Sequence, residues 1–216
     1  MAEQKSNRRN VMRLAVAGAV AVVAVGIYVS LDAESNTADA ACAATTERAA
    51  SLDEHAVGQV AAFRVSSAPD DLSDLAFRNA AGDPMTIADF SGRVVLVNLW
   101  ATWCAPCREE MPALDQLEAE FGGEDFQVLA VSLDTSNTPG GPRAFLEEYG
   151  IDDLDLYVDP TARLLSQIQR IGLRGGLPTT MLVDEQGCTL GLMEGPADWA
   201  GPDAVNLIEA ALAGEG

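Results

Sequence analysis

Two cysteines separated by two residues, Cys104 and Cys107, have the clearest chemical potential in this sequence. They lie in the segment Trp103-Cys104-Ala105-Pro106-Cys107, between an apolar run of strand length and a helical pattern. A helix start offers free N–H groups and positive dipole character, so a cysteine there commonly has its pKa lowered to about 3.5–7.5, against about 8.5 when free. The spacer lets the two sulfurs close a small ring, and Pro106 has a φ angle suited to a first helical turn. We therefore predict a redox-active pair, in which Cys104 is the exposed nucleophile that forms a mixed disulfide and Cys107 is the thiol that resolves it.

A structural disulfide and half of a zinc site are the other interpretations of this pair. Zinc would need two more ligands, but the sequence has no second C-x-x-C and a single histidine, His55. The same lone imidazole argues against a Ser-His-Asp hydrolase. A non-catalytic copper-binding module that uses Cys104 and Cys107 stays open. We expect no resident metal and no cofactor besides the Cys104–Cys107 disulfide.

The charge balance is strongly acidic. The 216 residues include 13 Lys+Arg and 33 Asp+Glu, which gives a formal net charge of −20. Phosphate contacts need clustered basic residues, and the chain has one lysine, so we expect no nucleic-acid partner. With 48% hydrophobic and 21% charged residues, the composition is that of a folded domain rather than a disordered chain.

The N-terminal region predicts a membrane anchor. Four basic residues, the last of them Arg13, precede an uncharged apolar run at 14–31. As a helix this run would span about 27 Å, close to the roughly 30 Å hydrocarbon core of a bilayer. We expect residues 1–13 in the cytoplasm, 14–31 as a single transmembrane signal anchor, and the rest of the chain outside the cytoplasmic membrane. A cleaved signal peptide with an A-x-A site at 38–40 is the alternative.

Residues 32–71 form the link to the main domain. They are rich in Ala, Ser, Thr, Asp and Glu, and apolar residues at roughly helical spacing predict a helix over 40–63. The segment is either a spacer or a helical arm packed on the domain, and the sequence favours neither. Pro69 lies in the probable boundary at 66–71, so the main domain is expected at 72–214.

Strands and helices are expected to alternate in the main domain. Residues 94–100 are almost continuously apolar, as in a central strand buried on both faces, and residues 107–121 repeat apolar side chains at three- and four-residue steps. Gly82 marks the turn of an early hairpin, and residues 184–187 mark the turn of a late one. Strands are predicted at 75–77, 85–87, 94–100, 126–133, 154–158, 179–183 and 189–193, and helices at 107–121, 143–149, 161–171 and 203–213. This order predicts an α/β class with a mixed central β-sheet.

The segment VVLVNLWATWCAPCREEMP at 94–112 resembles the active-site signature of thioredoxin-fold proteins. It is closest to the membrane-anchored TlpA/ResA/CcmG branch, and within that branch to TlpA-type members. The resemblance extends over about 72–213 and includes Gly176-Leu177-Pro178-Thr179-Thr180. It implies a thioredoxin-like fold and a membrane-tethered, periplasmic thiol–disulfide oxidoreductase that reduces client cysteine pairs during cytochrome oxidase or cytochrome c biogenesis. The implied partners are a copper chaperone, a cytochrome oxidase subunit or apocytochrome c as client, and a membrane thiol reductant as electron donor.

The resemblance also implies roles for single residues. Pro178 matches the family's cis-proline, which faces the active disulfide and leaves the backbone of Leu177 free to pair with a substrate strand. Glu110 matches an acidic residue near the C-x-x-C and could exchange a proton with Cys107, although a solvated helix charge is an equal alternative. Asn98 departs from thioredoxin, which carries a buried Asp at this strand position. The expected substrate contacts are Trp103, Ala105, Pro106, Leu177 and Thr179.

Two cysteines lie outside the motif. If Cys104 pairs with Cys107, Cys42 and Cys188 remain, and the resemblance favours a structural disulfide between them. Two free thiols are the alternative. The direction of exchange also has an alternative, because an oxidant or isomerase uses the same chemistry. The Ala-Pro dipeptide lacks the histidine of strong oxidants, which favours a reductase.

Overall fold

The computed structural model of this chain describes residues 42–170 and 176–214. The predicted cytoplasmic segment 1–13 and transmembrane segment 14–31 lie outside these residues, as does the first part of the predicted link. In the described part of the chain, none of the helices has the length and apolar character needed to cross a bilayer.

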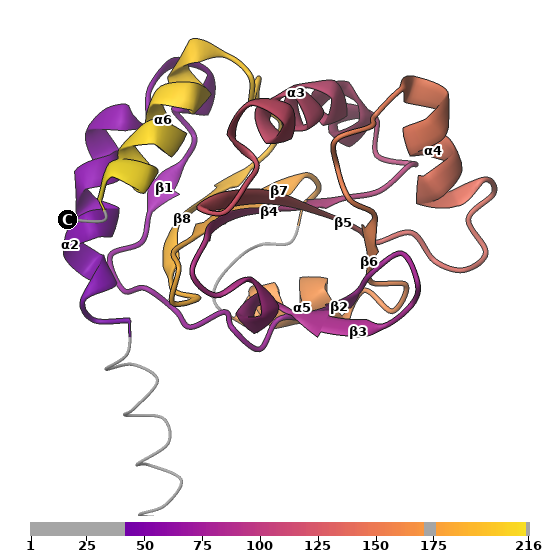
Figure 1. The fold of residues 1–216 in the computed structure, drawn as a ribbon, viewed down its shortest axis with the longest axis horizontal. Helices are drawn as coiled ribbons and strands as arrows, with labels where there is room; N and C mark the ends of the chain where they lie inside the picture. The colour runs from indigo at the N-terminus through magenta and orange to yellow at the C-terminus, as the bar shows by residue number, and fades with distance from the viewer. Residues whose placement is uncertain (1–41, 171–175, 215–216) are drawn as a thin grey trace, which may run out of the picture. The chain divides into compact units, whose positions relative to one another are not determined.

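The described residues form an eight-stranded mixed sheet in the order β1-β8-β7-β4-β5-β6-β2-β3 (Figure 1). Strand β4 pairs in parallel with β5, and β5 pairs in parallel with β6, whereas the other pairings are antiparallel. The predicted α/β class with a mixed sheet is therefore confirmed. The strands are β1 (Arg64–Val65), β2 (Ala76–Arg78), β3 (Pro84–Thr86), β4 (Val94–Trp100), β5 (Phe126–Ser132), β6 (Tyr157–Val158), β7 (Thr179–Val183) and β8 (Thr189–Glu194).

The central strand β4 is buried along its whole length. Its side chains alternate between two hydrophobic clusters: Leu96 and Trp100 belong to one, and Val97 and Leu99 to the other. Because successive side chains of a strand point to opposite faces, Asn98 shares the face of Leu96 and Trp100. A strand with apolar residues on both faces needs cover on both sides, which the helices provide.

Helices cover the two faces unequally. The first cluster packs β4 against the apolar residues of α3 (Ala105–Phe121), α4 (Gly141–Tyr149) and α6 (Pro202–Ala213). The second packs it against α5 (Arg163–Arg170), the β2–β3 hairpin and the short 3₁₀-helix η3 (Ile87–Phe90). In Figure 1, α3, α4 and α6 lie above the sheet, and α5 lies below it. The domain thus has three layers, and α3 and α5 face each other across the sheet.

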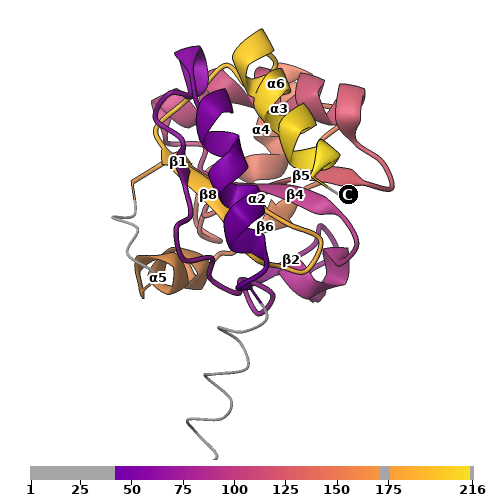
Figure 2. The same ribbon diagram turned by 90° about the vertical axis from the view of Figure 1, so that its left-hand side faces the viewer.

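Residues 42–65 are an arm packed on the domain, which answers the question that the sequence left open. The arm contains α2 (Thr45–Ser51), the 3₁₀-helices η1 (Leu52–His55) and η2 (Gly58–Val60), and β1, which pairs with β8. Figure 1 and Figure 2 show α2 beside β8 and near α6. The single helix predicted for 40–63 is wrong, because the helical turns end at His55 and Val57 is extended; the chain then turns at Gly58, whose φ of +53° is costly for other residue types.

The arm is fastened at the β7–β8 turn. Cys42 and Cys188 form a disulfide with a Cα–Cα distance of 5.4 Å, and both residues are buried. Nearby, Arg48 donates two hydrogen bonds to the carboxylate of Glu185, at 2.6 and 2.8 Å, and one to the carbonyl of Ala211. The arm, the late hairpin and the last helix are therefore joined covalently and by charge.

Candidate active site

Cys104 is the N-cap of α3, directly after the strand β4 and a short turn. Its backbone N–H donates to the carbonyl of Ala101 at 3.0 Å, and its sulfur accepts the backbone N–H of Cys107 at 3.3 Å. Pro106 lies in the first helical turn, where a missing N–H donor costs nothing. Cys104 and Cys107 are joined by a disulfide in this structure. The sulfur of Cys104 thus takes the capping position where a helix end stabilises negative charge.

The two sulfurs differ in access. Cys104 is 6% exposed and Cys107 is 0% exposed, so Cys104 is the more accessible, although it is less exposed than the sequence predicted. It lines a groove of about 420 Å³, here called the catalytic groove. Because only one sulfur opens to this groove, a partner disulfide can approach Cys104 but not Cys107. The groove is lined by Trp103, Cys104, Pro106, Leu133, Ala162, Leu165 and Leu177.

Trp103 is 66% exposed, so it forms one side of the catalytic groove and is not packed in the core. Trp100, four residues earlier in the chain than Cys104, is fully buried. An exposed tryptophan beside a reactive sulfur offers a large apolar surface to a partner polypeptide at little entropic cost.

The Leu177–Pro178 segment, which precedes β7, lies at the same groove as the Cys104 segment. The peptide bond between Leu177 and Pro178 is cis, and Leu177 lines the catalytic groove. Thr179 begins β7, opposite Leu99 of β4, and donates its hydroxyl to the Gly176 carbonyl at 2.6 Å.

The predicted substrate-contact residues therefore separate into three groups. Trp103, Pro106 and Leu177 line the catalytic groove. Ala105 is exposed beside it but does not line it. The side chain of Thr179 is buried, and its hydroxyl donates to the Gly176 carbonyl, so this side chain does not line the catalytic groove.

Glu110 is a buried carboxyl one helical turn after Cys107. Its side chain accepts three hydrogen bonds: from Asn98 Nδ2 at 2.8 Å, from the Ala197 backbone N–H at 3.1 Å and from Trp199 Nε1 at 3.2 Å. Glu110 is 3% exposed, which excludes the solvated helix charge. Burial raises the pKa of Glu110 from 4.5 to about 7, because the charged form loses its hydration, and the three donors oppose that rise.

The Glu110 network joins α3 to β4, to β7 and to the segment before α6. Asn98 also donates to Thr180 Oγ1 at 2.9 Å, while its own Oδ1 has no hydrogen-bond partner among the described residues. A carboxyl with a pKa near 7 can take up and release a proton at neutral pH, whereas an amide such as Asn98 cannot. Sequence reasoning missed Trp199, because nothing in its local sequence indicates a contact 89 residues away.

A separate cavity of about 330 Å³ reaches Glu110 from the outside. It shares none of its lining residues with the catalytic groove, so the buried Glu110 borders a hollow that a partner in the groove leaves free. The cavity is lined by Gln59, Glu109, Glu110, Ala113, Pro196, Ala197 and Asp198. In the described ranges, no three His, Cys, Asp or Glu residues are grouped so as to hold a metal ion.

Comparison with known proteins places this geometry in a family. The model of the AhpC/TSA family matches residues 68–189, more than half of the chain. The thioredoxin-like protein YneN of Bacillus subtilis is 32% identical over 120 residues, which are 53% of this chain and 64% of that protein. The thiol-disulfide oxidoreductase ResA of Geobacillus thermodenitrificans is 33% identical over 127 residues, which are 56% of this chain and 64% of that protein. ResA of Oceanobacillus iheyensis is 32% identical over 101 residues, 47% of this chain and 49% of the relative.

Solved structures agree on the fold. A Chlorobium tepidum protein described as a thiol:disulfide interchange protein DsbE has a TM-score of 0.57 and 29% sequence identity, and the match covers 67% of this chain and 96% of that chain. The chain spans between about half and two thirds of the length of the curated relatives named above. The ResA and DsbE names are consistent with the TlpA/ResA/CcmG branch that residues 94–112 predicted. On the extent of the family match, the chain belongs to the AhpC/TSA family and has its thioredoxin-like fold.

Proposed function

We propose that this chain is a thiol–disulfide oxidoreductase that reduces disulfides between cysteine pairs of client proteins. One observation carries the proposal: the sulfur of Cys104 caps α3, accepts the N–H of Cys107 and is the one sulfur of the pair that opens to a groove. A structural disulfide has no need of a helix cap or of a groove with an exposed tryptophan. The names of the ResA and DsbE relatives support the same chemistry.

The reaction transfers two electrons in two exchange steps. In the reduced protein, the Cys104 thiolate attacks one sulfur of a client disulfide; the client S–S bond breaks, a Cys104–client disulfide forms, and the first client sulfur leaves as a thiolate and takes up a proton. The Cys107 thiol then loses its proton and attacks Cys104, which releases the second client sulfur. The client gains two thiols, and the protein returns to the disulfide state of this structure.

Glu110 is placed to serve the second step. Cys107 is fully buried, so water cannot reach its thiol directly, whereas Glu110 lies one turn further along the same helix and has a pKa of about 7. We assign to Glu110 the uptake of the Cys107 proton and its release to water through the cavity beside Glu109 and Asp198.

The finer parts of the proposal concern location and partners. The apolar run at 14–31 supports a single-pass anchor in the cytoplasmic membrane with the domain in the periplasm. In that compartment a membrane thiol reductant would supply the electrons, and the clients would be a copper chaperone, a cytochrome oxidase subunit or apocytochrome c. This assignment to cytochrome oxidase or cytochrome c biogenesis rests on the resemblance of the active-site segment.

Trapping tests the proposal. In the Cys107→Ser variant, the Cys104–client disulfide cannot be resolved, so client proteins should accumulate on Cys104 and be identified by mass spectrometry after expression in the native host. Cys104→Ser/Cys107→Ser is the matched control, because it has the same fold and no attacking sulfur. Recovery of equal amounts of disulfide-linked protein from the two variants would contradict the proposal. Equilibration with glutathione buffers tests the direction: a reductase should have a potential below about −200 mV, and a value well above it would indicate an oxidant.

A further inference from the structure

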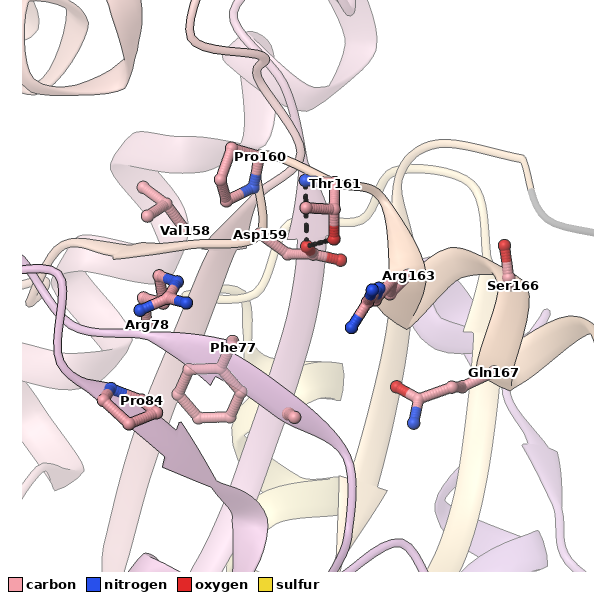
Figure 3. Close-up of a pocket in the computed structure, with 11 residues that line it drawn as sticks. Phe77, Arg78, Pro84, Val158, Asp159, Pro160, Thr161, Arg163, Ser166 and Gln167 are labelled. Carbon is pink, nitrogen blue, oxygen red and sulfur yellow. Dashed lines mark hydrogen bonds between the residues drawn. The ribbon is translucent and has the colours of Figure 1, made fainter.

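A second hollow lies beside the catalytic groove, at the far side of α5. It encloses about 490 Å³ between β2, the start of β3, the connection from β6 to α5, and α5 itself. Figure 3 shows Arg78 on one side of this hollow and Arg163 and Gln167 on the other. We call it the arginine pocket and define it by Arg78, Arg163, Ser166 and Gln167, which supply its polar lining together with Asp159 and Thr161.

The two guanidinium groups of the arginine pocket are not neutralised. Arg78 donates to the backbone carbonyl of Gly82 at 2.7 Å, which is an uncharged partner. Arg163 makes no ion pair or hydrogen bond with any residue that the structure describes. Asp159 is the one acidic residue of the lining. Its buried carboxylate accepts hydrogen bonds from residues close to it in the chain: from the N–H and the hydroxyl of Thr161 and from the N–H of Leu164.

The pocket also holds an unmet acceptor. The Oε1 atom of Gln167 is buried and has no hydrogen-bond partner in the described part of the chain. Because that atom is shielded from solvent, the pocket can recognise a ligand through the remaining guanidinium N–H groups of Arg78 and Arg163, which suit a carboxylate. Guanidinium groups match the planar geometry of a carboxylate, and charge-assisted hydrogen bonds of this kind are the stronger ones. An acidic side chain of a polypeptide supplies such a carboxylate.

The sheet places the arginine pocket at the same edge as Cys104. The parallel ladders align Trp100 with Ser132 and Ser132 with Val158, and the antiparallel bridge aligns Val158 with Arg78. Since neighbouring strands are about 4.8 Å apart, the backbone of Arg78 lies about 14 Å from that of Trp100, the last residue of the strand that leads to Cys104.

The connection into α5 and the helix itself form the wall between the two hollows. Ala162 and Leu165 line the catalytic groove, whereas Arg163 and Ser166, next to them in the sequence, line the arginine pocket. An extended polypeptide advances about 3.3 Å per residue, so about four residues span the distance between the backbones of Arg78 and Trp100, which sets the scale of the separation between the pocket and Cys104.

From this arrangement we infer that the arginine pocket binds an acidic side chain of the client polypeptide, about four residues from the cysteine that exchanges with Cys104. The inference rests on the proposed function and adds a specificity site to it. The chain carries a net charge of −20 and disfavours acidic partners at long range, so the pocket selects the position of a carboxylate rather than an acidic protein in general.

Matched peptides test this inference. Each peptide contains one cysteine, blocked as a mixed disulfide with 2-mercaptoethanol, and either Glu or Gln four residues away on one side or the other. The rate constant for attack by the reduced full chain is measured for each peptide. For one of the two placements, the Glu peptide should react about fivefold faster than its Gln partner, the effect of an exposed ion pair between a carboxylate and a guanidinium. Arg78→Gln/Arg163→Gln should bring this ratio to about one, and because the ratio is taken within one variant, a general loss of activity cancels.

The control is Arg64→Gln/Arg143→Gln, which removes two exposed arginines outside the pocket and should keep the wild-type ratio. A wild-type ratio of about one, or equal loss of the ratio in both double variants, would overturn the inference and leave the proposed function standing. The proposed function fails separately if the reduced chain attacks neither the peptides nor 2-hydroxyethyl disulfide.

Discussion

Replacing Glu110 by Gln should change how the stability of the protein depends on pH. The pKa of Glu110 is raised from 4.5 to about 7, so the stability that this group contributes is fully present below pH 4.5 and is lost as the pH rises through 7. This rise in the pKa of Glu110 corresponds to about 3 kcal/mol of stability, of which about 2–3 kcal/mol is lost between pH 5 and pH 8. Gln does not titrate, so the free energy of unfolding of Glu110→Gln lacks this loss.

Urea denaturation of the oxidised chain at pH 5 and pH 8 measures the effect, and both values avoid the pI near 4.1. The quantity of interest is the wild-type stability minus the variant stability, which should be about 2–3 kcal/mol larger at pH 5 than at pH 8. Any pH-independent cost of the amide, such as a poorer contact with Trp199, cancels in this comparison. Glu109→Gln is the matched control, because it removes the same charge from an exposed neighbour on α3. A difference below about 1 kcal/mol, or one of opposite sign, would refute the account of Glu110 as a carboxyl held near neutrality by burial.

Three further outcomes are expected. Cys42→Ser/Cys188→Ser should lower the free energy of unfolding by up to about 5 kcal/mol, the loop-entropy limit for a separation of 146 residues, while the reduced variant still attacks 2-hydroxyethyl disulfide; an unchanged urea midpoint would contradict this. Arg48→Met should lower the free energy of unfolding, measured by urea denaturation, by about 3 kcal/mol, because it removes both hydrogen bonds to the largely buried carboxylate of Glu185. A decrease below about 1 kcal/mol would count against a structural role for this ion pair. Trp103→Ala should change stability by less than about 0.5 kcal/mol, since the side chain is 66% exposed, but slow the attack on peptide disulfides; equal peptide rates would exclude a contact with clients.

Much of the sheet could be predicted because burial alone sets its pattern. Residues 94–100 and 179–183 are apolar runs whose bounds agree with β4 and β7, and glycines at positive φ, Gly82 and Gly187, mark the two hairpin turns. The short elements were predicted less well. The two-residue strand β1 follows from its antiparallel pairing with β8 and leaves no pattern of its own in the sequence. The predicted strand at 154–158 shrinks to Tyr157–Val158.

The candidate site also has a part that the local sequence predicts and a part that it does not. Cys104 and its helix are local, so spacing and helix chemistry were enough to predict the cap. The partners of Glu110 are not local: Asn98 comes from β4 and Trp199 from the segment before α6, and only the folded chain brings them together. The arginine pocket is hidden for the same reason, since Arg78 belongs to β2 and Arg163 to α5, and only the folded chain brings them to one pocket.

The direction of β7 fixes where the disulfide of the arm lies relative to Cys104. Strand β7 runs antiparallel to β4, with Thr179 beside Leu99 and Val183 beside Val95, so the β7–β8 turn that holds Cys42 lies at the end of the sheet opposite to Cys104. The covalent joint between the arm and the β7–β8 turn and the reactive sulfur of Cys104 therefore occupy opposite ends of the domain.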